Sequence, residues 1–242
     1  METPLKLSIV LPTYKEKENL AVFVPQILAE FQDTAHEIIV VDDGSHDGTR
    51  ELLEEMRKTH PNVLMLERAG LLGLGSALRD GYNKASGEYI LSSDADCSFS
   101  AGDMRALYQK IQTGFDLVLG YKIAQGAHDA KPGTFSFHGW CENKIISPMS
   151  NAVIGLLCGI GLKNYNTDFR IMRRDLWQRL ATVEDRHFFL FEVILKARRA
   201  GARIAEIPVT FAPRMAGESK VSFFKQAPAY FWKLVKMVFF TR

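Results

Sequence analysis

Two aspartates separated by a single residue, Asp94 and Asp96, follow a short apolar run over 89–92. Carboxylate oxygens are ligands that Mg²⁺ uses in proteins, and the ion commonly takes its remaining ligands from phosphate oxygens and water. Such an ion neutralises the charge that develops on a departing diphosphate. The pair by itself is a weak signal, because a polar turn with a helix cap uses the same residues. Its place after a predicted strand favours a metal and nucleotide site.

Further acidic residues follow two earlier apolar runs. Glu16 comes after the run over 7–11, and Asp42 and Asp43 follow the run over 37–41. Ligands of open α/β sheets bind outside the carboxyl ends of the strands, so we expect these carboxylates at one edge. A turn or a helix cap accounts for one of the paired aspartates. The other is then available to a nucleotide base or ribose.

A glycine pair, Gly73 and Gly75, precedes a predicted helix that carries Arg79. Bare backbone at the start of a helix can approach a diphosphate closely. The third glycine of the dinucleotide-binding fingerprint is missing, and the pair follows the third predicted strand, which disfavours a Rossmann site. Phosphate contact and a plain flexible loop stay open for the glycines. For Arg79, nucleotide contact and a solvated surface position stay open.

Short apolar strands alternate with helical patterns over residues 5–120. The predicted strands span 7–11, 37–41, 63–66, 89–92 and 116–119. The predicted helices span 18–31, 49–59, 76–85 and 101–113. This alternation indicates βαβ units, and therefore an α/β fold with a mostly parallel central sheet and flanking helices.

The pattern changes after Tyr121. We expect, in chain order, a mobile loop over 123–137, a helix over 141–162, a strand over 169–172, helices over 175–181 and 189–200, and a last strand over 202–211. The change divides a catalytic domain over 1–222 into a nucleotide-binding half, 1–120, and an acceptor half, 121–222. A basic aromatic helix is predicted over 223–242.

The composition excludes several classes of protein. Hydrophobic residues make up 47% of the 242 residues and the formal net charge is +2, so neither disorder nor nucleic-acid binding is indicated. The three cysteines form no C-x-x-C pattern, which disfavours a zinc site or a disulfide framework and favours a reducing compartment. We find no secretory signal pattern and no apolar run long enough to span a bilayer. A cytoplasmic protein is therefore expected.

Four stretches of the chain resemble family 2 glycosyltransferases in order and spacing. They are Val10–Glu16, Val40–Thr49, Gly73–Ala77 and Ser93–Asp96. Three later stretches extend the resemblance to the branch of dolichol-phosphate mannose synthases and their bacterial polyprenyl-phosphate relatives. They are Phe169-Arg170, Glu206–Val209 and Arg214-x-x-x-Gly217-x-Ser219-Lys220.

The resemblance implies a GT-A fold and inverting transfer of a hexose from GDP-mannose, UDP-glucose or a similar donor to a polyprenyl or dolichyl phosphate. It assigns the base and ribose to Pro12, Tyr14, Glu16 and Asp42. It assigns Mg²⁺ or Mn²⁺, with part of the ribose, to Asp94 and Asp96, with Ser98 as a third metal-side position. From their positions, we add Asp43, Gly73 and Arg79 as candidate nucleotide contacts.

On the acceptor side, the resemblance implies that Arg214, Ser219 and Lys220 close over the donor diphosphate or the acceptor phosphate. Asp94, Asp96, Arg214 and Lys220 are thus the candidate catalytic residues. Lys122 and Ser147 are further candidate acceptor contacts. Three residues depart from the branch, which has arginine at Lys122 and Asn143 and aspartate at Asn164. Lysine keeps the charge but loses the bidentate fork, and asparagine loses both.

Two acceptor classes therefore stay open. A phosphate nucleophile is already ionised, whereas a hydroxyl acceptor needs a carboxylate base within hydrogen-bond reach. The candidate bases are Asp168, Glu184, Asp185 and Glu192, and we prefer surface salt bridges or helix caps for Glu184 and Asp185. A non-catalytic sugar-nucleotide-binding protein is the alternative from another class. A metal-dependent nucleotidyltransferase is a weaker one.

The C-terminal segment interleaves phenylalanines and Trp232 with lysines. A helix of this composition can lie in the interface of an anionic membrane, and it can equally pack on the body of the domain. We expect a nucleotide-sugar donor and a lipid-phosphate acceptor as partners, with peripheral contact to the cytosolic face of a membrane as an open possibility. The sequence gives no oligomeric state.

Overall fold

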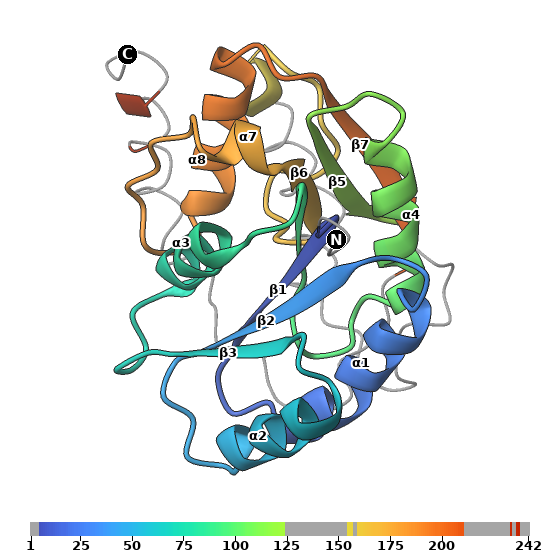
Figure 1. Cartoon of the computed structure of the whole chain (residues 1–242). Helices are drawn as coiled ribbons and strands as arrows, with labels where there is room; N and C mark the ends of the chain where they lie inside the picture. Colours follow the sequence, from blue (N-terminus) through green and yellow to red (C-terminus); the bar gives the residue numbers. More distant parts are fainter. Residues whose placement is uncertain (1–4, 124–153, 157–158, 211–232, 234–235, 238–242) are drawn as a thin grey trace, which may run out of the picture.

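The computed structural model of the chain describes residues 5–123, 154–156, 159–210, 233, 236 and 237. A seven-stranded sheet with the order β3-β2-β1-β4-β6-β5-β7 forms its centre (Figure 1). The strands are β1 (Leu7–Thr13), β2 (His36–Asp42), β3 (Val63–Glu67), β4 (Tyr89–Ser92), β5 (Leu117–Lys122), β6 (Arg170–Arg173) and β7 (Ile204–Val209). The predicted α/β class and mostly parallel sheet are confirmed.

One strand runs against the others. β6 is antiparallel to both of its neighbours, β4 and β5, whereas the remaining pairs of strands are parallel. The apolar run over 169–172 predicts this strand but not its direction. The direction matters because Phe169 and Asp168 then lie at the carboxyl end of β4, where Ser92 pairs with Arg170.

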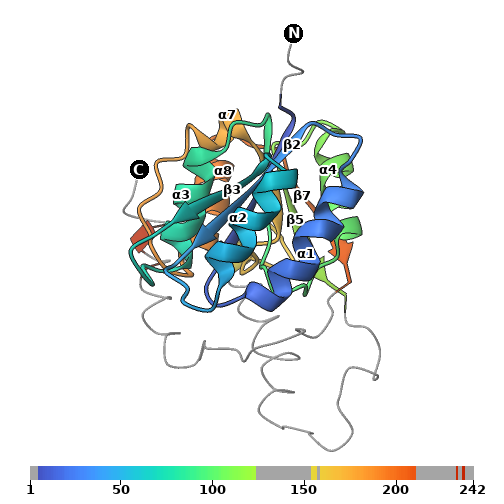
Figure 2. The same ribbon diagram turned by 60° about the horizontal axis from the view of Figure 1, so that its bottom comes forward.

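Helices cover both faces of the sheet (Figures 1 and 2). They are α1 (Lys17–Glu30), α2 (Thr49–Thr59), α3 (Leu74–Lys84), α4 (Ala101–Ile111), α7 (Arg174–Trp177) and α8 (Phe189–Arg199). α1, α2 and α4 lie on one face, and α3, α7 and α8 lie on the other. Along β1, Ile9 and Leu11 pack into the core of the first face and Val10 into that of the second. Burial on both faces explains the uninterrupted apolar strands.

The helix predicted over 175–181 is shorter than expected and ends at Trp177. Beyond it the chain continues in turns, in which Arg179 donates its backbone N–H to Leu176 and Leu180 to Trp177, both at 2.9 Å. The predicted loop over 123–137 and most of the helix over 141–162 lie outside the described residues, as does most of 211–242. No helix in the part of the chain that the structure describes is long and apolar enough to cross a bilayer.

Candidate active site

The loops that follow β1, β2, β3 and β4 meet at one edge of the sheet. Backbone hydrogen bonds join Asp43 to Thr13 at 3.0 Å and Ser93 to Val10 at 3.3 Å. A third joins the Arg68 N–H to the Asp42 carbonyl at 2.9 Å. Because parallel strands end on the same side, residues far apart in sequence become neighbours here. The edge is the one expected to carry the carboxylates.

Asp42 forms the turn after β2. Its carboxylate accepts hydrogen bonds from the Ser45 hydroxyl at 2.5 Å and the Ser45 backbone N–H at 2.9 Å. The Ser45 hydroxyl oxygen accepts in turn from the backbone N–H of Lys15 at 2.7 Å, and Lys15 has a left-handed φ of 59°. Tyr14, which precedes Lys15, is half-buried. The first two loops are thus connected through one carboxylate. At the start of α2, the backbone N–H of Thr49 donates to the Asp47 carboxylate and not to Asp42.

Asp43 is buried and paired with Arg68, a residue that the sequence patterns do not single out. Arg68 follows β3, is 8% exposed, and donates to both Asp43 and the Ser76 hydroxyl. Its Nε lies 3.0 Å from Asp80, in ion-pair distance but not aligned as a hydrogen bond. Burial raises the pKa of Asp43, and the Arg68 charge opposes that rise. Arg68 therefore holds the second aspartate against the start of α3.

The predicted metal-side residues form a tight turn after β4. Asp96 is 4% exposed, and its carboxylate accepts from the backbone N–H of Ser98 at 3.0 Å. Cys97 between them has a φ of 60°. The Ser98 hydroxyl is buried and has no hydrogen-bond partner among the described residues. Asp94 is half-buried at the mouth of the turn.

A third carboxyl group joins this turn from the residues that precede β6. Asp168 is buried, and its carboxyl group is hydrogen-bonded to Asp94. Burial raises the pKa of Asp168, and the hydrogen bond with Asp94 and the charge of Arg170 oppose that rise. The cation nearby is Arg170, which is fully buried and donates to the Leu190 carbonyl at 3.2 Å. His187 faces the same group, and burial lowers its pKa. No sequence signal marks His187.

The segment 182–187 closes this side of the site. Glu192 is fully buried and accepts from the backbone N–H groups of Val183 and Glu184, both at 2.9 Å. It also pairs with Lys196 at 2.8 Å. These contacts make Glu192 the anchor of the segment. The predicted salt bridges of the other two candidate bases are confirmed, since Glu184 pairs with Lys233 and Asp185 with Arg79.

The two loop glycines pack against this same segment. A Cβ atom at Gly73 would lie 2.4 Å from the Asp185 carbonyl oxygen. One at Gly75 would lie 2.7 Å from the carbonyl oxygens of Glu184 and Arg186. Close approach of protein backbone therefore accounts for both glycines. Arg79 donates to Asp185 at 2.8 Å from one turn further along α3.

Of the acceptor-side candidates, the structure describes Lys122, which is exposed at the end of β5. Ser147, Arg214, Ser219 and Lys220 lie outside the described residues, as does Asn143. Asn164 donates its backbone N–H to Glu206 at 3.0 Å, and its side chain accepts from Asn166. This asparagine thus shapes the turn that leads into β6.

Residues 8–181 match the profile of glycosyl transferase family 2. Polyprenol monophosphomannose synthase from Mycolicibacterium smegmatis is 28% identical over 221 residues, which cover 88% of this chain and 80% of that protein. Dolichol-phosphate mannosyltransferase from Pyrococcus furiosus is 30% identical over 219 residues, 90% of this chain. The match covers 59% of that second protein.

Among solved structures, the fold is similar to glucosyl-3-phosphoglycerate synthase from Mycobacterium tuberculosis in complex with Mn²⁺, uridine diphosphate and glucosyl-3-phosphoglycerate. The TM-score is 0.67 at 18% identity, and the match covers 97% of this chain and 78% of that one. A further structure of the same enzyme holds Mg²⁺ and uridine diphosphate, with a TM-score of 0.66. At this identity the similarity concerns the fold.

Proposed function

The chain belongs to glycosyltransferase family 2, and from this premise we propose that it moves a hexose from a nucleoside-diphosphate sugar to a polyprenyl or dolichyl phosphate. The observation that carries the proposal is the meeting of Asp42 and Asp43 with Asp94 and Asp96 at one edge of the sheet. Nucleotide ligands of open α/β sheets bind at such an edge. The names of the two mannosyl-transferring relatives support the lipid-phosphate acceptor.

The turn after β4 fits a hard divalent cation, Mg²⁺ or Mn²⁺. Asp94 and Asp96 offer carboxylate oxygens, and the buried Ser98 hydroxyl offers another oxygen with no partner among the described residues. Within the described part of the chain, no three His, Cys, Asp or Glu side chains are grouped to hold an ion. The protein would thus supply few ligands and leave the rest to donor phosphates and water, which is typical of Mg²⁺. The ion supplies charge neutralisation at the leaving diphosphate.

We assign the base and ribose of the donor to Pro12, Tyr14, Glu16, Asp42 and Asp43 in the loops after β1 and β2. Both Asp42 oxygens accept from Ser45, and each carboxylate oxygen retains a lone pair that can accept from a base or ribose. Gly73 and Arg79 stay in the proposal as nucleotide-side residues. In support, Gly73 accepts from the Ser76 hydroxyl, which Arg68 joins to Asp43, and Arg79 follows on the same helix.

The carboxyl groups of the site favour a phosphate acceptor over a hydroxyl. Glu184, Asp185 and Glu192 are engaged in ion pairs, and Asp168 is buried and hydrogen-bonded to Asp94. A phosphate oxygen needs no base. It attacks the anomeric carbon in line while the bond from that carbon to the donor diphosphate breaks. The nucleoside diphosphate leaves, and the configuration inverts.

Positive charge is needed to hold an ionised acceptor and the leaving diphosphate. We assign this role to Lys122, Arg214 and Lys220, with Ser147 and Ser219 as hydroxyl donors. A lipid acceptor also requires contact with a membrane surface, and we place the enzyme on the cytosolic face. The C-terminal lysines Lys233 and Lys236 are both helical, and their positive charge suits an anionic membrane surface.

The test is a screen of nucleotide sugars with Mg²⁺ or Mn²⁺, with and without a short polyprenyl phosphate, that reads nucleoside diphosphate release and product mass. We expect lipid-dependent release that falls at least about a hundredfold in Asp96→Asn, the scale of one lost electrostatic contact to the transition state. Asp33→Asn, an exposed aspartate paired with Arg105, is the matched control and keeps full activity.

Each other outcome has a defined meaning. Nucleoside diphosphate release that depends on a hydroxyl compound would mean that the acceptor is a hydroxyl and not a lipid phosphate. Donor binding without release supports a sugar-nucleotide-binding protein. Release of pyrophosphate from a nucleoside triphosphate supports a nucleotidyltransferase.

A further inference from the structure

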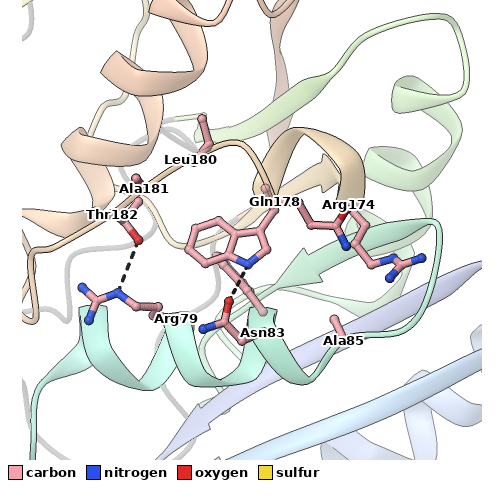
Figure 3. Close-up of a pocket in the computed structure, with 10 residues that line it drawn as sticks. Arg79, Asn83, Ala85, Arg174, Gln178, Leu180, Ala181 and Thr182 are labelled. Carbon is pink, nitrogen blue, oxygen red and sulfur yellow. Dashed lines mark hydrogen bonds between the residues drawn. The ribbon is translucent and has the colours of Figure 1, made fainter. Parts of the chain in front are cut away.

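A cavity of about 380 Å³ lies between the second half of α3 and the stretch from α7 to Thr182. Figure 3 shows Arg79 and Asn83 rising from α3 toward this stretch, with Arg79 and Arg174 at opposite ends. The cavity is separate from the active site. Arg174 donates its backbone N–H to Glu88, just before β4 begins, whereas Asp94 and Asp96 follow the other end of that strand. Its volume falls in the usual range of small-molecule sites.

The floor of the cavity is aromatic and rigid. Tyr82 and Trp177 are 1% and 5% exposed, and their rings meet edge to face with centroids 5.0 Å apart. The Trp177 indole N–H donates to the Asn83 side-chain oxygen at 3.0 Å. Because an indole can only donate, this bond fixes which end of the Asn83 amide faces Trp177. The Asn83 NH₂ group is then left to donate. The floor is thus closed by buried aromatic rings beside a fixed donor.

The rim is positively charged. Two arginines, Arg79 and Arg174, line the cavity, and none of the ten described lining residues carries a carboxylate. Arg79 is occupied by Thr182, Glu184 and Asp185. Among the described residues, the Arg174 guanidinium makes no hydrogen bond or ion pair, and it lies beside the Gln178 amide. A guanidinium with five donors in a fixed fork matches carboxylate and phosphate groups.

From this arrangement we propose that the cavity binds a small organic anion, with a phosphate or carboxylate group at Arg174 and its body in the cavity beside Trp177. The ligand is distinct from the sugar donor and the acceptor. Arg79 connects the two sites, because it lines the cavity and also holds the segment 182–185 that packs on Gly73 and Gly75.

The test uses phenyl phosphate as the probe, titrated into the full-length protein by calorimetry at constant ionic strength. The donor site is kept filled with saturating nucleoside diphosphate and Mg²⁺, so that it does not contribute. We expect saturable binding, which Arg174→Gln weakens at least about tenfold, the effect of one charge-assisted hydrogen bond. Phenol, which has the ring without the charge, is expected not to bind measurably. Benzoate in place of phenyl phosphate distinguishes a carboxylate ligand from a phosphate ligand.

Two further variants keep the proposal open to contradiction. Ala181→Phe fills the cavity from an exposed position and should abolish binding without touching the core. Arg179→Gln removes the same charge from an exposed neighbour that does not line the cavity and should leave binding unchanged. Absence of saturable binding to the wild-type protein, or equal weakening in Arg174→Gln and Arg179→Gln, would overturn the proposal. Thermal melts of each variant establish that it is folded.

Discussion

At the scale of the residue, the site depends on side chains whose role no motif predicts. Arg68 joins Asp43 to Ser76, and His187 and Arg170 surround Asp168. Arg68 and Arg170 are buried charges, which proteins tolerate only when they are paired, and His187 is half-buried. The acidic motifs therefore require buried partners that come from distant parts of the chain.

Arg68→Gln removes the cation that offsets the burial of Asp43. The carboxyl group then remains in a site that already raises its pKa. We expect a loss of about 3 kcal/mol in the free energy of unfolding, as for other broken buried pairs. Urea denaturation measures it. Arg50→Gln, which breaks solvent-exposed pairs with Glu54 and Glu67, should cost much less. Equal losses of unfolding free energy in the two variants would show that burial does not make the Arg68–Asp43 pair more stabilising than an exposed pair.

His187 makes stability depend on pH. Burial lowers its pKa in the folded protein below the ordinary 6.5, so the unfolded chain takes up a proton first as the pH falls. The contribution of neutral His187 is complete above pH 6.5 and is lost on acidification toward the lower folded pKa. We expect His187→Gln to be less sensitive between pH 7 and 5 than the wild type. An NMR titration of the His187 ring that gives a pKa above 6.5 would contradict this.

At the scale of the element, glycines set how closely α3 can approach its neighbours. At Gly81, a Cβ atom would lie 2.4 Å from Val10 and 2.9 Å from Val41, so α3 lies directly on β1 and β2. At its start, Gly73 and Gly75 allow the segment 184–186 to pack on the helix. Gly73 and Gly75, which resemble a phosphate loop, are thus also needed for α3 to pack against the segment 184–186.

Gly81→Ala and Gly102→Ala form a matched pair, since both glycines are helical. We expect Gly81→Ala to destabilise the protein by about 1–3 kcal/mol, because the added methyl group overlaps the sheet. At Gly102 the nearest atom is the Ser100 hydroxyl at 3.7 Å, so alanine should be neutral or stabilise by up to about 1 kcal/mol. Thermal or urea unfolding compares the two variants. Similar values for both would show that α3 can move away from the sheet.

At the scale of the whole molecule, one sheet with helices on both faces carries the residues proposed for the donor on its edge, outside the two cores. Asp94 and Asp96 belong to a turn and not to the packing of either face. Occupancy of that turn by a cation should therefore govern activity more than stability.

Removal of divalent cations tests this separation. We expect EDTA to abolish sugar transfer and Mg²⁺ or Mn²⁺ to restore it, while circular dichroism and the melting temperature change by no more than a few degrees. Full transfer in EDTA would contradict the proposed metal. A collapse of the fold in EDTA would indicate that an ion is part of the core.

The sequence alone determined the strands and helices of the first half, the α/β class and the edge at which the acidic residues gather. Those features depend on hydrophobic period and on neighbours along the chain, which a sequence displays directly. Other features required the tertiary structure: the reversed direction of β6, the hydrogen bond of Asp168 with Asp94, the pairing of Arg68 with Asp43, and the position of His187. The partners lie far apart in sequence, for example 25 positions in the Arg68–Asp43 pair and 76 in the Ser92–Asp168 contact. Such contacts depend on how strands cross over and pack, which a local sequence pattern does not show.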